Sequence, residues 1–108
     1  MTTITIKTNN NFYEYVECKG HTGFGEVGTD VLCASISSLI QGCALGIKNV
    51  ANVNIDIQTN NDGYYKFTIP FNISKNQQMQ VNTLVATLTE CLKDLLKGYS
   101  KYMKLEEI

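Results

Sequence analysis

Apolar and polar side chains alternate in short segments of this chain and recur at helical spacing in two longer ones. Residues 3–7 alternate, and residues 12–19 are rich in aromatic and β-branched side chains, so both segments are predicted strands. A long helix is expected to begin at Thr29 or Asp30, since either is a good N-cap, and to run to about Lys48. Its residues are small or apolar on most sides, which is typical of a buried helix.

The second half of the chain repeats this pattern. Residues 53–59 and 64–70 alternate on either side of Asn60-Asn61-Asp62-Gly63, which predicts a β-hairpin. A second helix is expected over residues 74–97, with Gly98 as its C′ residue. Its apolar positions fall at i, i+3, i+4 and i+7 and form an amphipathic stripe: Val81, Leu84, Val85, Leu88, Cys91, Leu92, Leu95 and Leu96.

With a short last strand over residues 101–106, the element order is β-β-α-β-β-α-(β). This order predicts an α+β fold in two layers, with two helices packed on an antiparallel or mixed sheet. A length of 108 residues corresponds to one domain spanning residues 1–108. The content of 44% hydrophobic and 18% charged residues is that of a globular chain.

Charge and hydropathy narrow the partners that we expect. A net charge of −1 and the lack of any Lys/Arg cluster argue against direct nucleic-acid binding. No apolar run is long enough for a membrane span and no signal peptide is visible, so we expect a cytoplasmic protein with no membrane partner. The four cysteines are then expected to be reduced. Their spacing, with a single histidine, matches no usual zinc site, so no metal and no cofactor are expected.

The most informative segment is the loop that joins the second predicted strand to the first predicted helix. It contains the only histidine of the chain, His21, and it leads to Cys33 in the first turn of that helix. It also holds half of the eight glycines: Gly20, Gly23, Gly25 and Gly28. The loop therefore joins a histidine flexibly to a cysteine twelve residues later.

Three interpretations of this loop are open. Residues 23–28 match the G-x-G-x-x-G dinucleotide fingerprint, but the best helix caps follow the last glycine, and Glu26 and Asp30 would place negative charge near a pyrophosphate. A second interpretation is a mobile connector with an incidental histidine. The third is a cysteine nucleophile with a histidine partner. It is favoured because His21 ends a rigid strand and because a helix N-terminus stabilises a thiolate at Cys33.

In the third interpretation, Cys33 attacks a carbonyl as a thiolate, and His21 protonates the leaving amine. Unpaired N–H groups at the start of the helix, including that of Cys33, would bind the oxyanion. Asp30 either orients His21 or caps the helix. Ser37 lies one turn after Cys33 on the same face, where it either lines the site or bonds back to the helix backbone. The other cysteines are expected in the core: Cys18, Cys43 and Cys91.

The loop and the start of the helix resemble the signature of the ribosomal-processing cysteine proteases called Prp. The matching residues are Gly20-His21-Thr22-Gly23 and Gly28-Thr29-Asp30-Val31-Leu32-Cys33-Ala34-Ser35-Ile36-Ser37. The family pattern is Gly-His-Ala, a glycine-containing loop, then Gly-x-Asp-Ile-Val-Cys-Ala-Ala-Val-Ser. His, Asp, Cys and Ser therefore match in order and spacing. The departures lie outside the His–Cys pair and include Thr22, Leu32, Ser35 and Ile36.

The resemblance implies a homodimeric, cytoplasmic bacterial endopeptidase. Its substrate would be the short N-terminal extension of a large-subunit ribosomal protein, cut at a hydrophobic sequence. The resemblance also implies that Cys33 is the nucleophile, that His21 is its proton-transfer partner, and that Asp30 and Ser37 belong to the same site. The glycine loop would order over bound peptide. The alternative function is a non-catalytic, ribosome-associated module whose loop clamps a partner peptide.

Overall fold

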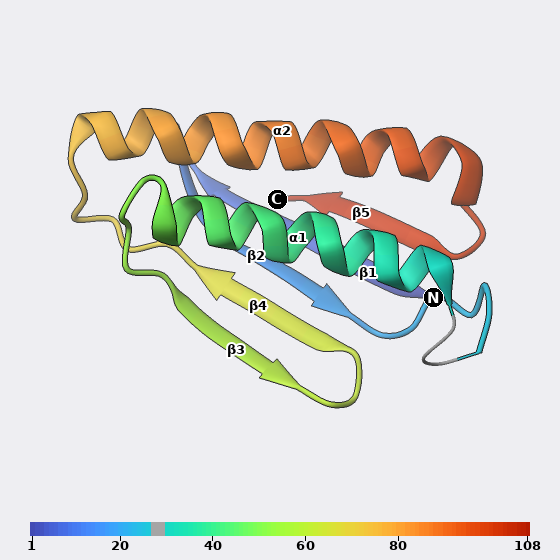
Figure 1. Cartoon of the computed structure of the whole chain (residues 1–108). Coiled ribbons are helices and arrows are strands. Elements are labelled where there is room, and N and C mark those ends of the chain that lie inside the picture. The colour runs from blue at the N-terminus through green and yellow to red at the C-terminus, as the bar shows by residue number, and fades with distance from the viewer. Residues whose placement is uncertain (27–29) are drawn as a thin grey trace.

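The computed structural model describes residues 1–26 and 30–108, which form a sheet covered on one face by two helices (Figure 1). The sheet order is β3-β4-β2-β1-β5. The elements, in chain order, are β1 (Thr2–Asn9), β2 (Phe12–Lys19), α1 (Val31–Asn49), β3 (Asp56–Asn60), β4 (Tyr64–Thr68), α2 (Lys75–Tyr99) and β5 (Met103–Glu107). The predicted α+β class and element order are confirmed.

The sheet is mixed because one of its pairings is parallel. The pairs β1–β2, β2–β4 and β3–β4 are antiparallel, whereas β5 runs parallel to β1 after the α2 crossover. Lys19, the last residue of β2, lies opposite Tyr64, the first residue of β4. This register brings the start of the glycine loop beside the turn that joins β3 to β4.

Each helix begins at a side chain that accepts backbone N–H bonds. Asp30 is the N-cap of α1, and Ser74 caps α2 in a reciprocal capping box with Gln77. Gly98 lies inside α2, whose C-cap is Ser100, so its prediction as the C′ residue was wrong. The apolar stripe of α2 packs inward along most of its length, and the helix continues two residues past the predicted stop, to Tyr99.

Only one stripe of α1 is buried, so the prediction of a helix buried on most sides was also wrong. The buried residues are Leu32, Ile36, Ile40, Cys43, Ala44 and Ile47. Val31 and Leu45 are exposed on the opposite side, because α1 packs against the sheet and α2 and nothing in the described chain covers its outer face. By length and composition alone α1 could cross a membrane. The core helix of a globular protein passes the same test, and α1 buries one stripe of its residues in the core cluster.

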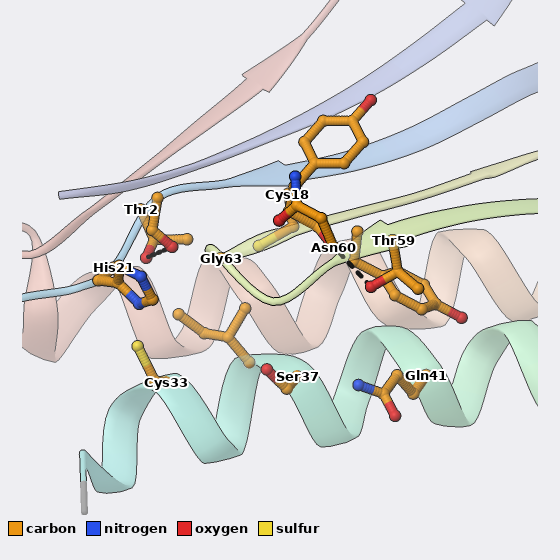
Figure 2. Close-up of a pocket in the computed structure, with 13 residues that line it drawn as sticks. Thr2, Cys18, His21, Cys33, Ser37, Gln41, Thr59, Asn60 and Gly63 are labelled. Atoms are coloured by element: carbon orange, nitrogen blue, oxygen red, sulfur yellow. Dashed lines mark hydrogen bonds between the residues drawn. The ribbon is translucent and has the colours of Figure 1, made fainter. Parts of the chain in front are cut away.

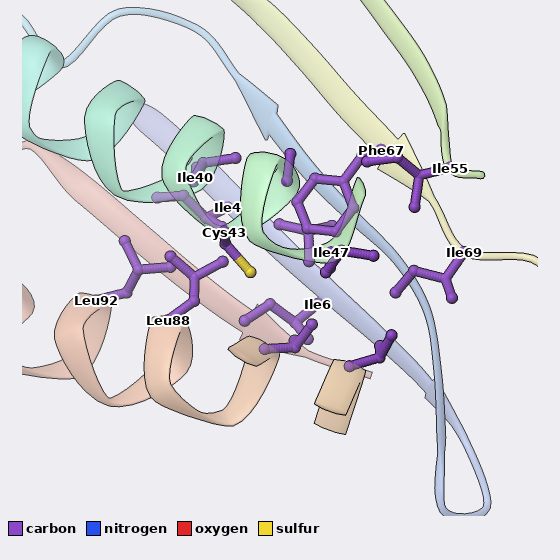
Figure 3. Packing of buried hydrophobic residues seen from close by; sticks show 14 of the residues in the cluster. Ile4, Ile6, Ile40, Cys43, Ile47, Ile55, Phe67, Ile69, Leu88 and Leu92 are labelled. Atoms are coloured by element: carbon purple, nitrogen blue, oxygen red, sulfur yellow. The ribbon is translucent and has the colours of Figure 1, made fainter. Parts of the chain in front are cut away.

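The core lies between the helices and the covered face of the sheet (Figure 3). One row of register partners crosses this face from Ile6 through Val16 and Phe67 to Ile57. The first three side chains are buried and Ile57 is 42% exposed, so the core thins toward the β3 edge. The hydrophobic effect therefore anchors β4 firmly and β3 weakly.

The strand predicted over residues 53–59 begins later, at Asp56. Val53 and Ile55 are buried as their alternation predicts, but their backbone N–H groups bond to Ile47 and Val53 rather than to a neighbouring strand. The alternation at residues 53–55 therefore reflects burial of the connector between α1 and β3, not a paired strand.

Candidate active site

His21 is mounted immediately after β2 by contacts to its neighbour Gly20. The Gly20 N–H donates to the Gly63 carbonyl at 2.8 Å, and the Gly20 carbonyl accepts from the Thr2 hydroxyl at 3.3 Å. Gly20 has φ +90°, and a Cβ there would lie 2.6 Å from the Met1 carbonyl oxygen. Only glycine fits this turn, so the sheet and the N-terminus together fix where His21 leaves β2.

Cys33 lies in the first turn of α1, as the sequence predicts. In Figure 2 its sulfur points from the helix toward the His21 imidazole. The backbone N–H of Thr22 donates to Cys33 Sγ at 3.4 Å, so the residue after His21 touches the sulfur. No hydrogen bond joins His21 to Cys33 directly in the part of the chain that the structure describes. The two side chains line one pocket.

Asp30 caps α1 and holds the glycine loop against it. Its carboxylate accepts from Cys33 N at 2.9 Å, from Gly25 N at 3.0 Å and from the Thr22 hydroxyl. Burial raises the pKa of this carboxyl, but the bonds from Thr22 and from the N–H groups of Cys33, Gly25 and Leu32 outweigh it and lower the pKa to about 2. Of the two predicted roles, the cap is present. Among residues 1–26 and 30–108, no hydrogen bond joins Asp30 to His21, and Asp30 instead bonds to the neighbouring Thr22.

The cap changes the expected oxyanion site. The Cys33 N–H donates to the Asp30 carboxylate, and the Ala34 N–H donates to the Asp30 carbonyl at 3.0 Å. Both donors are therefore engaged, and the prediction that the Cys33 N–H is free for an oxyanion is wrong for this structure. Capping by Asp30 therefore occupies N–H groups that would otherwise be unpaired at the start of α1.

The pocket beside Cys33 has a volume of about 210 Å³ and runs along α1 toward the β3–β4 hairpin (Figure 2). Cys33, Ser37 and Gln41 follow one another at four-residue spacing on one wall, so Ser37 lies where the sequence places it. The opposite wall comes from the sheet. The complete lining is Thr2, Cys18, Gly20, His21, Cys33, Ile36, Ser37, Gln41, Thr59, Asn60, Gly63, Tyr64 and Tyr65.

The three other cysteines divide between the core and its edge. Cys43 is buried as predicted, and burial raises the pKa of its thiol to about 12. Cys18 is partly buried and packs against the core cluster as predicted, but it also lines the pocket. Burial, followed by the nearby Cys33 and Glu17, raises the pKa of Cys18 to about 11. Cys91 is half-buried on α2 rather than part of the core cluster.

The glycine loop turns away from the pocket after Thr22. Phe24 packs edge-on against Tyr99 and Tyr102, with ring centroids 5.4 and 5.3 Å away. Gly23 and Gly25 are exposed in this stretch and do not line the pocket, whereas Gly20 does. Gly28 and the alternative cap Thr29 lie outside the described residues.

Among the residues of this site that sequence reasoning missed are Thr22, Cys18 and Gly63. Gly63 was identified only as part of a hairpin turn, and the pairing of β2 with β4 that brings it to His21 is not visible in local patterns. Cys18 fits the alternating pattern of a strand, but how near it lies to Cys33 depends on how α1 packs against the sheet, which local patterns do not show either. In residues 1–26 and 30–108, no group of three or more His, Cys, Asp or Glu is placed to hold a metal ion.

Comparison with known proteins fits this geometry. The family model for cysteine protease Prp matches residues 1–104. The essential ribosomal processing protease Prp from S. aureus, solved with a covalently linked product peptide, superposes with a TM-score of 0.86 at 22% identity, with 100% of both chains covered. The same protease with a substrate peptide gives a TM-score of 0.82 at 20% identity and 100% coverage of both chains.

A further structural match is SMU.848 from Streptococcus mutans. Its TM-score is 0.85 at 23% identity, covering 100% of this chain and 94% of that one. A comparison with curated proteins gives no match. The family model spans nearly the whole chain and includes both His21 and Cys33. The chain therefore belongs to the cysteine protease Prp family.

Proposed function

We propose that this chain is an endopeptidase that removes the N-terminal extension of a large-subunit ribosomal protein, with Cys33 as nucleophile and His21 as acid and base. The observation that carries the proposal is the pocket shared by His21 and Cys33, with the Thr22 N–H on the Cys33 sulfur. The S. aureus relative has been solved with substrate and product peptides, which supports a peptide as the ligand of this pocket.

In this mechanism His21 takes the Cys33 proton, and the thiolate attacks the scissile carbonyl carbon. The C–S bond forms, the C–N bond breaks, and the His21 imidazolium gives its proton to the leaving amine. Water, with His21 as its base, then hydrolyses the thioester and frees Cys33. The Thr22 N–H donates to the sulfur from the residue that follows His21.

Family membership favours this function over the non-catalytic clamp. We further propose that the protein acts in the cytoplasm as a homodimer, as its family resemblance implies. The pocket lining is neutral apart from the titratable Cys, His and Tyr side chains. The pocket therefore suits a peptide with uncharged side chains, apolar or polar, better than a strongly charged peptide.

The test uses a peptide that spans the ribosomal-protein extension, with cleavage followed by mass spectrometry. Cys33→Ala and His21→Ala should each abolish cleavage while circular dichroism and Tm stay close to those of the wild type. Cys91→Ala is the matched control, because Cys91 is a half-buried cysteine on α2 away from the pocket. Cleavage retained by Cys33→Ala would exclude the nucleophile. Tight peptide binding by the wild type with no product would support the clamp instead.

A further inference from the structure

The turn between β3 and β4 lies directly against the imidazole of His21. A Cβ built on Gly63 would lie 3.0 Å from both Cε1 and Nε2 of His21, and 2.9 Å from the Gly20 carbonyl oxygen. Contacts of 3.0–3.4 Å are tighter than nine in ten real Cβ contacts, so a side chain at residue 63 would require the His21 ring to move by a few tenths of an ångström, and the Gly20 carbonyl to move as well. The contact joins positions more than forty residues apart.

The sheet holds this contact in place. The bond from Gly20 N to Gly63 O, at 2.8 Å, adds one rung to the β2–β4 ladder beyond the pair Lys19–Tyr64. The turn itself is closed by the Asn60 side chain, whose Oδ1 accepts from Asp62 N at 2.8 Å. Gly20, which directly precedes His21, and Gly63 are therefore placed by the same strand register.

We propose that Gly63 is a positioning residue for His21, because its bare Cα is the surface on which the imidazole rests as it faces Cys33. This inference rests on the proposed function of His21 as acid and base. The ring has the Gly63 backbone on one side and the first turn of α1 on the other. A side chain at residue 63 would shift the ring from this position by a few tenths of an ångström or more, and misplacement of a catalytic group relative to the reacting atoms lowers the rate.

The neighbouring Asp62 contributes little to this arrangement. Its Oδ1 lies 3.9 Å from His21 Nε2, but its side chain is 98% exposed. Exposed ion pairs are screened by water and add little. The shape of the turn, rather than its charge, is what places the ring. Asp62→Asn should therefore change kcat by about twofold or less.

One measurement tests the contact without any mutation. His21 is the only histidine, so its imidazole C–H signals in a proton NMR spectrum need no further assignment. Nuclear Overhauser effects should join these signals to the Gly63 Hα protons in the wild-type protein. If assigned Gly63 protons show no such effect, the proposed contact is overturned.

The functional test compares Gly63→Ala with Asn10→Ala. Gly63 has φ +72° and Asn10 has φ 60°, so both variants place alanine in a left-handed turn between two strands, and Asn10 is remote from the pocket. We expect Gly63→Ala to lower kcat by about 10- to 100-fold with little change in KM, and Asn10→Ala to leave both unchanged. Equal kcat values for the two variants would overturn the positioning role.

A second readout separates this inference from the proposed function. Alkylation of Cys33 by iodoacetamide at pH 6.5 is measured by mass spectrometry for the wild type, Gly63→Ala, Asn10→Ala and His21→Ala. Gly63→Ala should react as slowly as His21→Ala, and Asn10→Ala as fast as the wild type. This pattern in a protein that cleaves no peptide would reject the protease function and keep the positioning role. Normal alkylation and cleavage by Gly63→Ala would reject the role and keep the function.

Discussion

Thr22 is the residue that joins the nucleophile, the helix cap and the glycine loop. Its buried hydroxyl donates to Asp30, accepts from the Phe24 N–H at 3.2 Å and accepts from the Cys33 thiol at 3.6 Å. Its backbone N–H also contacts the Cys33 sulfur. The family pattern has alanine at this position, so this hydroxyl is a link that the pattern itself does not predict.

Removing this hydroxyl should weaken the fold and free the loop. Thr22→Val keeps the shape of the side chain but removes one of the donors to Asp30 and leaves the Phe24 N–H without this acceptor, which costs about 1–3 kcal/mol. Thr89→Val is the control, since Thr89 is also buried and its hydroxyl bonds within α2 to Val85 O. Urea denaturation should show a loss in both variants. Faster amide exchange at Phe24 should appear only in Thr22→Val, and Thr22→Ser should restore protection. Unchanged exchange at Phe24 would contradict this bond.

The cysteines should react in an order set by their environments. Burial holds the pKa of Cys18 near 11 and that of Cys43 near 12, so both thiols stay protonated at pH 7 and react only as the pH rises toward those values. Cys33 is partly exposed in the pocket beside an imidazole and should be the first of these three to be alkylated. Peptide mapping after brief iodoacetamide treatment at pH 7 checks the order, with urea-unfolded protein as the control in which all three react alike. An early adduct on Cys18 would contradict it.

Among the elements, α1 depends on its N-cap for both its start and its link to the glycine loop. Asp30→Ala removes the acceptor for Cys33 N and Gly25 N and should lower Tm. The pKa of Asp30 is about 2 in the folded protein, below the ordinary value of 3.8, so the unfolded chain binds the proton more tightly. The stabilisation is therefore fully present above about pH 4 and is lost as the pH falls from 3.8 toward 2.

Thermal unfolding followed by circular dichroism between pH 2 and pH 7 measures this dependence. The Tm difference between wild type and Asp30→Ala should be largest near neutral pH and should shrink in the acid range. Asp30→Asn keeps a capping side chain without the charge and should fall between the two. Asp94→Ala removes an exposed carboxylate from α2 and serves as the control. A Tm difference that stays constant down to pH 2 would argue against the charged cap.

The elements were predictable from sequence where local signals decide them, and less so where packing does. The alternation in β1, the aromatic-rich β2 and the capping residues Asp30 and Ser74 are local, and they placed the strands and helix starts well. Gly98 was misassigned because the packing of α2 extends the helix through it. The site divides in the same way. His21, Cys33, Asp30 and Ser37 lie within one short segment, whereas Gly63 reaches them only through strand pairing.

At the scale of the whole molecule, the pocket lies between α1, from the first half of the chain, and the β3–β4 hairpin, from the second half. α1 carries Cys33, Ser37 and Gln41, and the β3–β4 hairpin carries the opposite wall. Phe67 of β4 is buried in the core beneath α1 and holds the hairpin to the rest of the sheet. Core packing and the geometry of the pocket are therefore linked through one strand.

Phe67→Ala should show this link, with Ile57→Ala as its control. The two residues are register partners on the covered face, but Phe67 is fully buried and Ile57 is 42% exposed. We expect a loss of about 3–5 kcal/mol for Phe67→Ala and about 1 kcal/mol for Ile57→Ala in urea denaturation. Under folded conditions, Phe67→Ala should also increase amide exchange at Gly20, whose N–H bonds to Gly63 at the end of the same hairpin. A large stability loss with unchanged exchange at Gly20 would show that the core and the pocket are independent.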